Sequence, residues 1–216
     1  MSLPAIAPYP MPGPGDLPDN RVDWRPDPRR ALLLVHDMQN HFVNAFTPRR
    51  EPLNELMTNI GLLRATGVPV VFSAQPGAQD PGRRGLLKDF WGAGIGGDGH
   101  SQAIVDELAP APADVLLTKW RYSAFQRTEL LTIMRESGRD QLIICGIYAH
   151  IGCLMTACEA FMSDIQTFLV SDAVADFSAD YHRMALSYAA ERCAVVMPTH
   201  RLLDELAATG ASHASR

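Results

Sequence analysis

The sequence lacks the patterns that mark secreted, membrane-spanning or zinc-binding proteins. It has four cysteines in 216 residues, and none of them belongs to a C-x-x-C pair, so neither a disulfide framework nor a zinc site is expected. No apolar run approaches the roughly 18 residues needed to cross a bilayer. The start of the chain has no basic segment followed by an apolar core, which excludes a typical secretory signal. A reduced, cytoplasmic setting is therefore expected.

Blocks of charge and clustered metal ligands are also missing. The formal net charge is -5 and no run of like charges occurs, which argues against a protein that binds nucleic acids or membrane surfaces. The seven histidines, His36 and His150 among them, lack the spacing and the companion ligands of a metal site. No metal or other cofactor is therefore expected.

Proline is concentrated at the start of the chain. Six of the sixteen prolines fall within the first eighteen residues, so residues 1–30 are predicted to form an extended arm without regular structure. From Ala31 onward, short segments rich in Val, Ile and Leu alternate with helix-like segments. Residues 31–208 are predicted to form one domain, and residues 209–216 a flexible tail.

The short apolar segments predict strands that are covered on both faces, as in a parallel sheet. These strands are expected at Ala31–His36, Val68–Ser73, Val115–Thr118, Gln141–Cys145, Thr167–Ser171 and Ala194–Met197. Helices are expected between them, at Pro52–Ala65, Gln102–Leu108, Glu129–Glu136, Ile151–Met162, Ala179–Glu191 and Arg201–Ala208. Thr128 and Ser178 are expected to cap two of the helices. The alternation predicts an α/β fold of three layers, a doubly wound six-stranded parallel sheet with helices on both faces.

The segment from Gln75 to Gly99 is the exception, because it is rich in Gly and Pro and has no clean periodicity. A loop of this length inside a compact domain usually serves as a lid or a binding element. Its cations, Arg83, Arg84 and Lys88, are typical of surface charge, but they would form an anion clamp if the loop folded over a site.

Two strand ends carry charged candidates, and the carboxyl ends of parallel strands meet at the ligand-binding edge of a sheet. Asp37 follows the first strand and is either a turn-forming residue or a general acid or base. Lys119 follows the third strand, ahead of aromatic residues and Arg121, a mixture that suits an anionic, ring-shaped ligand. On pattern alone, Lys119 could equally be a solvated surface residue.

A third strand end is the turn Gly146–Cys153, which leads into the helix predicted at Ile151–Met162. Gly152 either permits a tight junction or lets a ligand or water approach the helix start, whose free N–H groups suit a carboxylate. Cys153 could be a nucleophile, because a helix N-terminus lowers the pKa of a thiol. A buried cysteine in apolar surroundings is more often inert, and the pattern favours that interpretation.

Five ordered segments resemble the isochorismatases, a branch of the isochorismatase-like cysteine hydrolase superfamily. These segments are Val35–Gln39, Ser73–Gly77, Gly85–Gly92, Lys119–Phe125 and Ala173–Ser178. The turn before Gly152 also resembles the active-site turn of these enzymes, and the resemblance spans Arg30 to about Leu206. The arm, with Tyr9-Pro10 and Val22-Asp23-Trp24, is similar to the start of siderophore- and phenazine-pathway isochorismatases.

The resemblance implies a reaction that needs no thiol. In the cysteine hydrolases of the superfamily, Asp and Lys activate a Cys that attacks an amide, whereas isochorismatases have Gly at that position and hydrolyse an enolpyruvyl ether. Gly152 occupies the position, and Cys153 would point roughly 100° away on a helix. A vinyl ether opens by protonation of its methylene carbon, after which water captures the oxocarbenium ion. The resemblance thus implies that Asp37 is the acid, with Lys119 orienting it and holding a substrate oxygen.

The resemblance also implies which residues contact the substrate. Gln75, Arg84, Tyr148 and the backbone of Gly152 would bind it, with Arg84 and the helix start holding carboxylates. A non-proline cis peptide is expected at Ile147-Tyr148. The pocket is expected to be lined by Phe42, Trp91 and Tyr122.

The implied substrate is isochorismate, and the implied products are pyruvate and 2,3-dihydro-2,3-dihydroxybenzoate, formed without a covalent intermediate. A second possible substrate is 2-amino-2-deoxyisochorismate, which gives 2,3-dihydro-3-hydroxyanthranilate in phenazine-type pathways. The residues also leave open a cysteine-dependent amidase that uses Cys153, or a catalytically silent scaffold of the same fold. Because the sequence ends soon after Leu206, no aryl carrier domain of the kind found in several siderophore isochorismatases is expected. A separate carrier protein or synthase is therefore expected as a partner, and a homodimer is expected from the resemblance.

Overall fold

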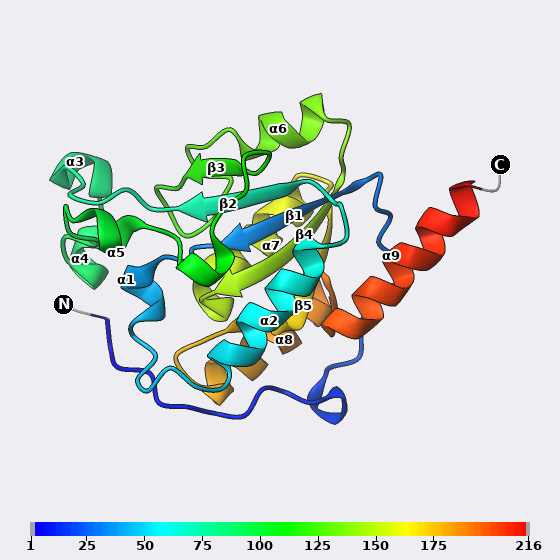
Figure 1. Ribbon diagram of the computed structural model, residues 1–216, viewed down its shortest axis with the longest axis horizontal. Helices are drawn as coiled ribbons and strands as arrows, with labels where there is room; N and C mark the ends of the chain where they lie inside the picture. The colour runs from blue at the N-terminus through cyan, green and yellow to red at the C-terminus, as the bar shows by residue number, and fades with distance from the viewer. Residues whose placement is uncertain (1–2, 215–216) are drawn as a thin grey trace.

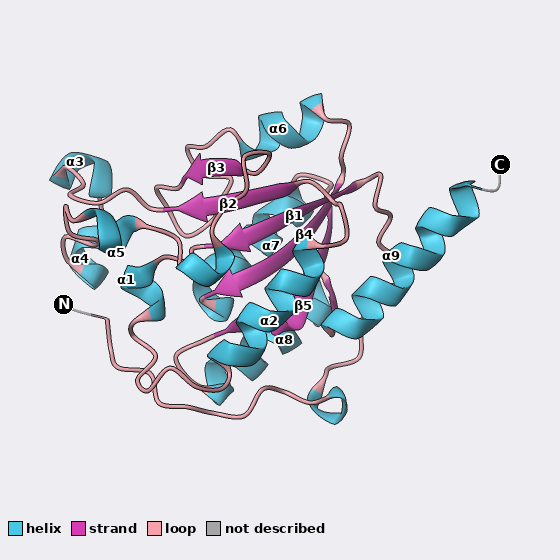
Figure 2. Ribbon diagram, viewed as in Figure 1, coloured by secondary structure: helices cyan, strands magenta, loops and turns pink. Residues whose placement is uncertain are grey.

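The fold is built on one sheet of six parallel strands, in the order β3-β2-β1-β4-β5-β6. A computed structural model describes residues 3–214 of the chain, and side chains as far as residue 211. The strands are β1 Ala31–His36, β2 Val70–Ala74, β3 Val115–Thr118, β4 Gln141–Ile147, β5 Gln166–Ala175 and β6 Val195–Met197. Figure 2 shows β1 to β5 side by side between helices on either face. The predicted doubly wound α/β sheet is confirmed.

The strand predictions were correct in number and differ mainly in length. β1 and β3 have the predicted bounds, whereas β4 and β5 extend further toward the ligand-binding edge of the sheet. The extra length arises because Gly146 pairs with Val174 and Ile147 pairs with Ala175, beyond an irregularity in the ladder. This additional pairing holds the turn after β4 against the end of β5.

Helices cover both faces of the sheet. They are α1 Asn40–Val43, α2 Leu53–Arg64, α3 Pro81–Arg84, α4 Leu87–Trp91, α5 Gly99–Gln102, α6 Leu130–Glu136, α7 Leu154–Met162, α8 Ala179–Arg192 and α9 Thr199–Ala214. Along β1, Leu33 and Val35 pack into one apolar cluster with α2 and α9, and Leu32 and Leu34 into another with α6, α7 and α8. Figure 1 shows α2 and α9 in front of the sheet and α7 behind it. Among the residues that the structure describes, no helix is long and apolar enough to cross a membrane.

One predicted helix was wrong. The segment Gln102–Leu108 is divided between the end of α5 and a separate 3-10 turn at Asp106–Leu108. Between them the backbone hydrogen-bonds to the chain that follows β1, with the Asn40 N–H donating to the Ala103 carbonyl at 2.9 Å and the Val105 N–H to the Met38 carbonyl at 2.9 Å. These long-range bonds replace the local bonds of a helix.

The helix ends also differ in detail from the prediction. Ser178 caps α8 as expected, because its hydroxyl accepts the Tyr181 N–H. The cap of α6 is Glu129, and Thr128 lies one residue earlier, where its hydroxyl accepts the Leu130 N–H at 3.2 Å. α9 continues to Ala214, so most of the segment predicted as a flexible tail is helical.

The N-terminal arm runs along one edge of the molecule (Figure 1), and its first ten residues are held at two places. Ile6, which is 1% exposed, donates its N–H to the Ala45 carbonyl at 2.7 Å and accepts the Thr47 N–H at 3.0 Å. The Tyr9 hydroxyl accepts the Asp176 N–H at 2.7 Å, beside the end of β5. The first part of the arm is therefore held at the same edge of the sheet as the strand ends, whereas Asn20 further along bonds to Val196 of β6.

The strand order places a ligand-binding crevice beside β1. From β1 the chain moves outward to β2 and β3, and it then returns to pair β4 with the other side of β1. Such a reversal of winding opens a crevice at the carboxyl ends of the two central strands. Asp37 follows β1 at this point, and the turn leading to Gly152 follows β4.

Candidate active site

Asp37 is held at the crevice by its own backbone and by β2. It has a left-handed backbone conformation, with a φ of 50°, which Asp adopts more readily than most residues. Its N–H donates to the Ser73 carbonyl at 3.1 Å, and the Ser73 hydroxyl donates to Asp37 Oδ1 at 2.7 Å. Because these bonds come from the neighbouring strand, the buried carboxylate has a fixed orientation.

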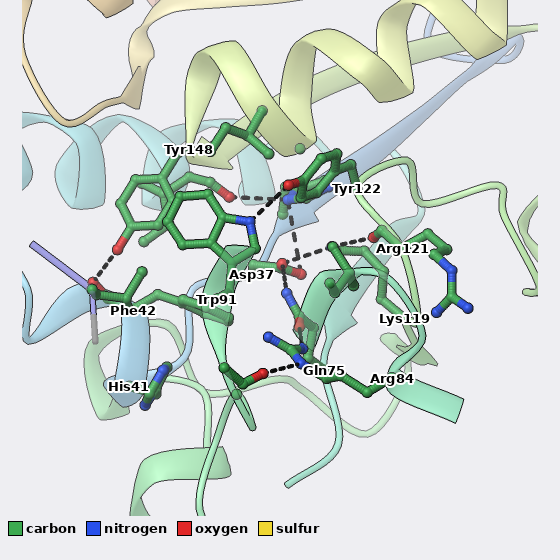
Figure 3. Close-up of a pocket in the computed structure, with 18 of the residues that line it drawn as sticks. Asp37, His41, Phe42, Gln75, Arg84, Trp91, Lys119, Arg121, Tyr122 and Tyr148 are labelled. Atoms are coloured by element: carbon green, nitrogen blue, oxygen red, sulfur yellow. Dashed lines mark hydrogen bonds and ion pairs between the residues drawn. The ribbon is translucent and has the colours of Figure 1, made fainter. Parts of the chain in front are cut away.

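Lys119 and Gln75 converge on the other oxygen of this carboxylate (Figure 3). Lys119 Nζ lies 2.9 Å from Asp37 Oδ2, and Gln75 Nε2 donates to the same oxygen at 3.1 Å. Lys119 is 2% exposed and also donates to the Arg121 carbonyl at 2.7 Å. The ends of β1, β2 and β3 thus bring together the acid, the amide and the amine that the sequence predicted for the site.

The electrostatics of the site favour an ionised Asp37 when no substrate is bound. Burial is the largest influence and raises the pKa of Asp37, but the charge and hydrogen bond of Lys119, with smaller contributions from His36 and Ser73, bring the pKa below its ordinary value. The same burial lowers the pKa of His36 to about 4, so this ring is neutral near neutral pH. The site therefore presents one carboxylate against one ammonium.

A second cation lies on the segment between β2 and β3. Arg84, at the end of α3, donates through Nη1 to Gln75 Oε1 at 3.2 Å and through Nε to the Gly92 carbonyl at 3.1 Å. Its guanidinium fits closely against Gly94, where a Cβ would lie 2.7 Å from Arg84 Cζ. Gly94 has a φ of +81°, so both space and backbone conformation require glycine there.

The predicted anion clamp consists of Arg84 alone. Arg83 and Lys88 are exposed, and the Arg83 guanidinium stacks over the Trp120 ring at 5.5 Å. The segment itself does cover the site, because its residues Leu87, Trp91 and Arg84 line the same cavity as Asp37. The loop thus lies where the predicted binding element would have to be.

Aromatic side chains form the walls of a cavity of about 280 Å³. The Tyr148 hydroxyl donates to the Phe42 carbonyl at 2.8 Å, and Trp91 Nε1 donates to the Tyr122 hydroxyl at 2.7 Å. These bonds fix the rings around a polar floor (Figure 3). The lining includes every predicted site residue: Asp37, Phe42, Gln75, Arg84, Trp91, Lys119, Tyr122, Tyr148 and Gly152.

The turn after β4 contains the predicted cis peptide, at Ile147-Tyr148. It continues as a π-helical turn over Ala149–Cys153, and α7 begins only at Leu154. The N–H groups of Ile151 and Cys153 both donate to the Tyr148 carbonyl, each at 3.2 Å. The N–H groups of Ile151 and Cys153 are thus already paired, which the prediction of a helix starting at Ile151 did not anticipate.

Cys153 lies outside the cavity. It is 0% exposed, within the apolar cluster beneath α7 and α8, and this burial raises the pKa of its thiol well above the ordinary value. Gly152, one residue earlier, lines the cavity. The structure therefore supports the prediction that Cys153 is an inert, buried residue.

Several lining residues were not predicted. Leu3, His41 and Phe177 line the cavity, and Ser73 orients the acid. Ser73 could have been found, because it is a polar residue at the end of an apolar strand beside Asp37. Leu3 gave no signal, because the path of the arm depends on contacts with distant residues. Within the described residues, no group of three or more His, Cys, Asp or Glu side chains is placed to hold a metal ion.

Comparisons with known proteins agree with this geometry. A family model described as the isochorismatase domain matches residues 31–201. The chain is 59% identical over 210 residues to the isochorismatase of Bacillus subtilis (strain 168), covering 95% of this chain and 67% of that protein. It is 50% identical over 207 residues to the phenazine biosynthesis protein PhzD1 of Pseudomonas aeruginosa, covering 94% of this chain and 99% of that protein.

A solved structure shares the fold. The cysteine hydrolase from Pseudomonas syringae pv. phaseolicola superimposes with a TM-score of 0.79 and 24% identity, over 87% of this chain and 97% of that one. At this identity the likeness concerns the fold alone. The family model and the two relatives reach further, and they show that this chain belongs to the isochorismatase family.

Proposed function

We propose that the protein is an isochorismatase, which hydrolyses the enolpyruvyl ether of isochorismate to pyruvate and 2,3-dihydro-2,3-dihydroxybenzoate. The observation that carries this proposal is the buried Asp37 carboxyl group, held between Lys119 and Ser73 at the floor of an aromatic cavity. An acid at this place suits a substrate that reacts by protonation of carbon. The name and the 59% identity of the Bacillus subtilis relative support the same substrate.

The cations of the site suit a substrate with two carboxylates. Lys119 and Arg84 line the cavity on the side of Gln75, so either can pair with an anionic oxygen of the ligand. A bound dianion also interacts with Lys119, which weakens the stabilisation of the ionised Asp37 by this ammonium. The dianion in addition places negative charge beside the carboxylate. Both effects raise the pKa of Asp37. Asp37 thus takes up a proton as the substrate binds.

The chemistry then needs only this proton and a water molecule. Asp37 transfers the proton to the methylene carbon, and the resulting oxocarbenium ion adds water to form a hemiketal. The hemiketal loses the ring oxygen as an alcohol and releases pyruvate. No nucleophilic side chain takes part, because Gly152 has none and Cys153 is buried outside the cavity.

A second candidate substrate is 2-amino-2-deoxyisochorismate, whose hydrolysis gives 2,3-dihydro-3-hydroxyanthranilate. It is favoured by the 50% identity to PhzD1, a phenazine biosynthesis protein matched over 99% of its length. The reacting ether is the same in both substrates, so Asp37 and Lys119 would act identically. The two candidates differ only at the ring substituent next to the ether carbon.

Pyruvate release tests the proposal directly. Purified protein is mixed with isochorismate or with its amino analogue, and pyruvate is followed through lactate dehydrogenase and NADH oxidation. The larger kcat/KM identifies the preferred substrate. Absence of pyruvate from both compounds, with a folded protein, would refute the proposed function. Hydrolysis of nicotinamide that stops after alkylation of Cys153 would support a cysteine-dependent amidase instead.

We also propose that the protein acts as a homodimer in the cytoplasm and passes its product to a separate carrier protein or synthase. The four free cysteines are compatible with a reducing compartment. Light scattering tests the dimer, and a monomeric mass at micromolar concentration would contradict it. Cell fractionation with an antibody tests the location.

A further inference from the structure

The ring of His36 occupies the space into which a side chain at position 152 would project. A Cβ atom built on Gly152 would lie 2.1 Å from His36 Cε1, 2.8 Å from Nε2 and 2.9 Å from Nδ1. Non-bonded carbon atoms prefer a separation of about 3.5–4.0 Å, so this overlap involves the whole edge of the ring. The neighbour is a rigid, fully buried imidazole rather than the mobile end of a flexible side chain.

The ring cannot easily move aside. Its Nδ1 hydrogen-bonds to the Ile147 carbonyl at 3.0 Å, next to the turn that carries Gly152. The backbone of His36 pairs with Gly146 across β1 and β4, and a Cβ on Gly146 would meet the His36 carbonyl oxygen at 2.2 Å. Ring and backbone are therefore both fixed against β4, and any relief of the overlap has to move the active-site turn.

Hydrogen bonding alone does not explain why a histidine lies here. Nε2 is buried with no partner at hydrogen-bonding geometry among the residues that the structure describes, although the Tyr122 backbone is near enough to influence the pKa of the ring. A buried polar atom without a partner is destabilising. Buried polar atoms are normally hydrogen-bonded, so an exception at an active site calls for a functional explanation.

We propose that His36 is a specificity-determining residue, which fills the place of the nucleophilic side chain of the cysteine hydrolases and so restricts the site to hydrolysis without a covalent intermediate. Gly152 and His36 then act as a pair. Glycine at position 152 removes the nucleophile, and the His36 imidazole fills the space that the missing side chain leaves. The ring lies beside the acid, with His36 Nδ1 3.8 Å from Asp37 Oδ1. This inference rests on the proposed function for the wild-type reaction, but its test does not use isochorismate.

Because the His36 ring occupies the space of a side chain at position 152, Gly152→Cys alone is expected not to produce a working thiol nucleophile. The double variant Gly152→Cys, His36→Val is expected to produce one. The probe is p-nitrophenyl acetate. The introduced thiolate attacks the ester carbonyl, a C–S bond forms, the C–O bond breaks to release p-nitrophenolate, and the thiol proton passes to Asp37 or to solvent. The burst of p-nitrophenolate gives the rate, and peptide mapping by mass spectrometry locates the acetyl group, which separates position 152 from the native cysteines.

Acetylation at position 152 is expected to be about a hundredfold faster in the double variant than in Gly152→Cys, because a displaced nucleophile loses its reactive geometry. Wild type and His36→Val, which have no thiol at this position, are the matched controls. Equal rates in the two thiol-bearing variants would overturn the proposal. A double variant that fails to fold while Gly152→Cys folds would overturn it as well.

A thermal unfolding cycle tests the same overlap without a reactive group. Gly152→Ala is expected to lower Tm by roughly 5 °C or more in the wild-type background, as overpacking of a fixed core does. In the His36→Val background the same substitution should lower Tm by much less. Additive effects would refute the pairing, and so would a Gly152→Ala protein that stays insoluble when His36→Val is added. Loss of pyruvate release is not a readout here, so failure of the proposed substrate and failure of this inference remain distinguishable.

Discussion

Lys119 Nζ lies 2.9 Å from Asp37 Oδ2, and both side chains are almost completely buried. In such a pair each charge compensates for the loss of hydration of the other, so removal of one partner leaves an uncompensated charge. The remaining group responds by changing its pKa. The acid strength of Asp37, on which the proposed reaction depends, therefore reflects burial, which raises its pKa, opposed chiefly by Lys119, which lowers it.

Replacement of the acid should abolish most turnover. Asp37→Asn preserves shape and most hydrogen bonds but has no proton to transfer, so kcat for pyruvate release is expected to fall by about 10²–10⁴-fold. Ser73→Ala is the matched control, because it removes the hydrogen bond to Oδ1 and leaves the carboxyl group in place. Ordinary turnover by Asp37→Asn would rule out Asp37 as the acid.

The same acid predicts a pH dependence of kcat/KM. Lys119 holds the pKa of Asp37 below its ordinary value in the free protein, so the protonated form becomes rarer as the pH rises. Between pH 5 and pH 8, kcat/KM should fall by about tenfold for each pH unit, as expected for one essential proton. Initial rates at low substrate concentration measure the slope. A flat profile would show that Asp37 does not have to gain a proton from solvent.

Removal of the ammonium should change the ionisation of Asp37 in a known direction. In Lys119→Met, burial continues to raise the pKa of Asp37 while its main opposing influence is gone, so the pKa is expected to move above its ordinary value. Carbon-13 NMR of the labelled carboxyl group follows the titration. Lys88→Met, at an exposed position of α4, controls for a change in net charge. An unchanged pKa of Asp37 in Lys119→Met would contradict this account of the site.

The four cysteines should react with iodoacetamide in an order that differs from that of a cysteine hydrolase. Cys158 is half-buried, and its contact with Cys193, with 3.7 Å between the Sγ atoms, lowers its pKa. Burial raises the pKa of Cys145 and Cys153 instead. Mass spectrometry is expected to find Cys158 labelled first, with pyruvate release retained. Early labelling of Cys153 with loss of activity would favour a cysteine-dependent amidase.

Stability should decrease in mild acid because of two buried histidines. Burial lowers the pKa of His36 and of His182 from 6.5 to about 4. Above pH 6.5 both rings are neutral in the folded and unfolded protein, and this contribution to stability is fully present. As the pH falls from 6.5 toward 4, the unfolded chain takes up protons that the folded chain does not, so the free energy of unfolding decreases.

Thermal unfolding at a series of pH values checks this prediction. Tm should fall across the window from pH 6.5 to pH 4, and His182→Gln, which keeps an amide near the Ser171 carbonyl but cannot titrate there, should show a smaller fall. A Tm that does not change between these pH values would mean that the two rings take up protons as readily in the folded protein as in the unfolded chain, which contradicts the prediction.

The strand ends were predictable because their positions follow from a rule of topology. Asp37 and Lys119 lie far apart in the sequence, but short apolar strands that alternate with helices have to form a parallel sheet, whose carboxyl ends share one edge. The family resemblance then supplied the roles of Gly152, Gln75 and Arg84. Local pattern and motif were thus sufficient for the fold class and for several polar residues of the site, but not for Ser73 or His41.

The remainder depended on contacts between distant segments. The break between Gln102 and Asp106 arises from hydrogen bonds to the chain after β1, which no helical periodicity can reveal. The overlap between His36 and Gly152 is of the same kind, because it depends on the register of β1 against β4. Both features could be recognised only in the three-dimensional structure.

The attachment of the N-terminal arm has a consequence for cloning. Leu3 forms part of the cavity wall and Tyr9 is fastened beside the end of β5, yet both precede the matched family region, residues 31–201. An expression clone trimmed to that region would discard a piece of the catalytic chamber, although its sheet would be whole.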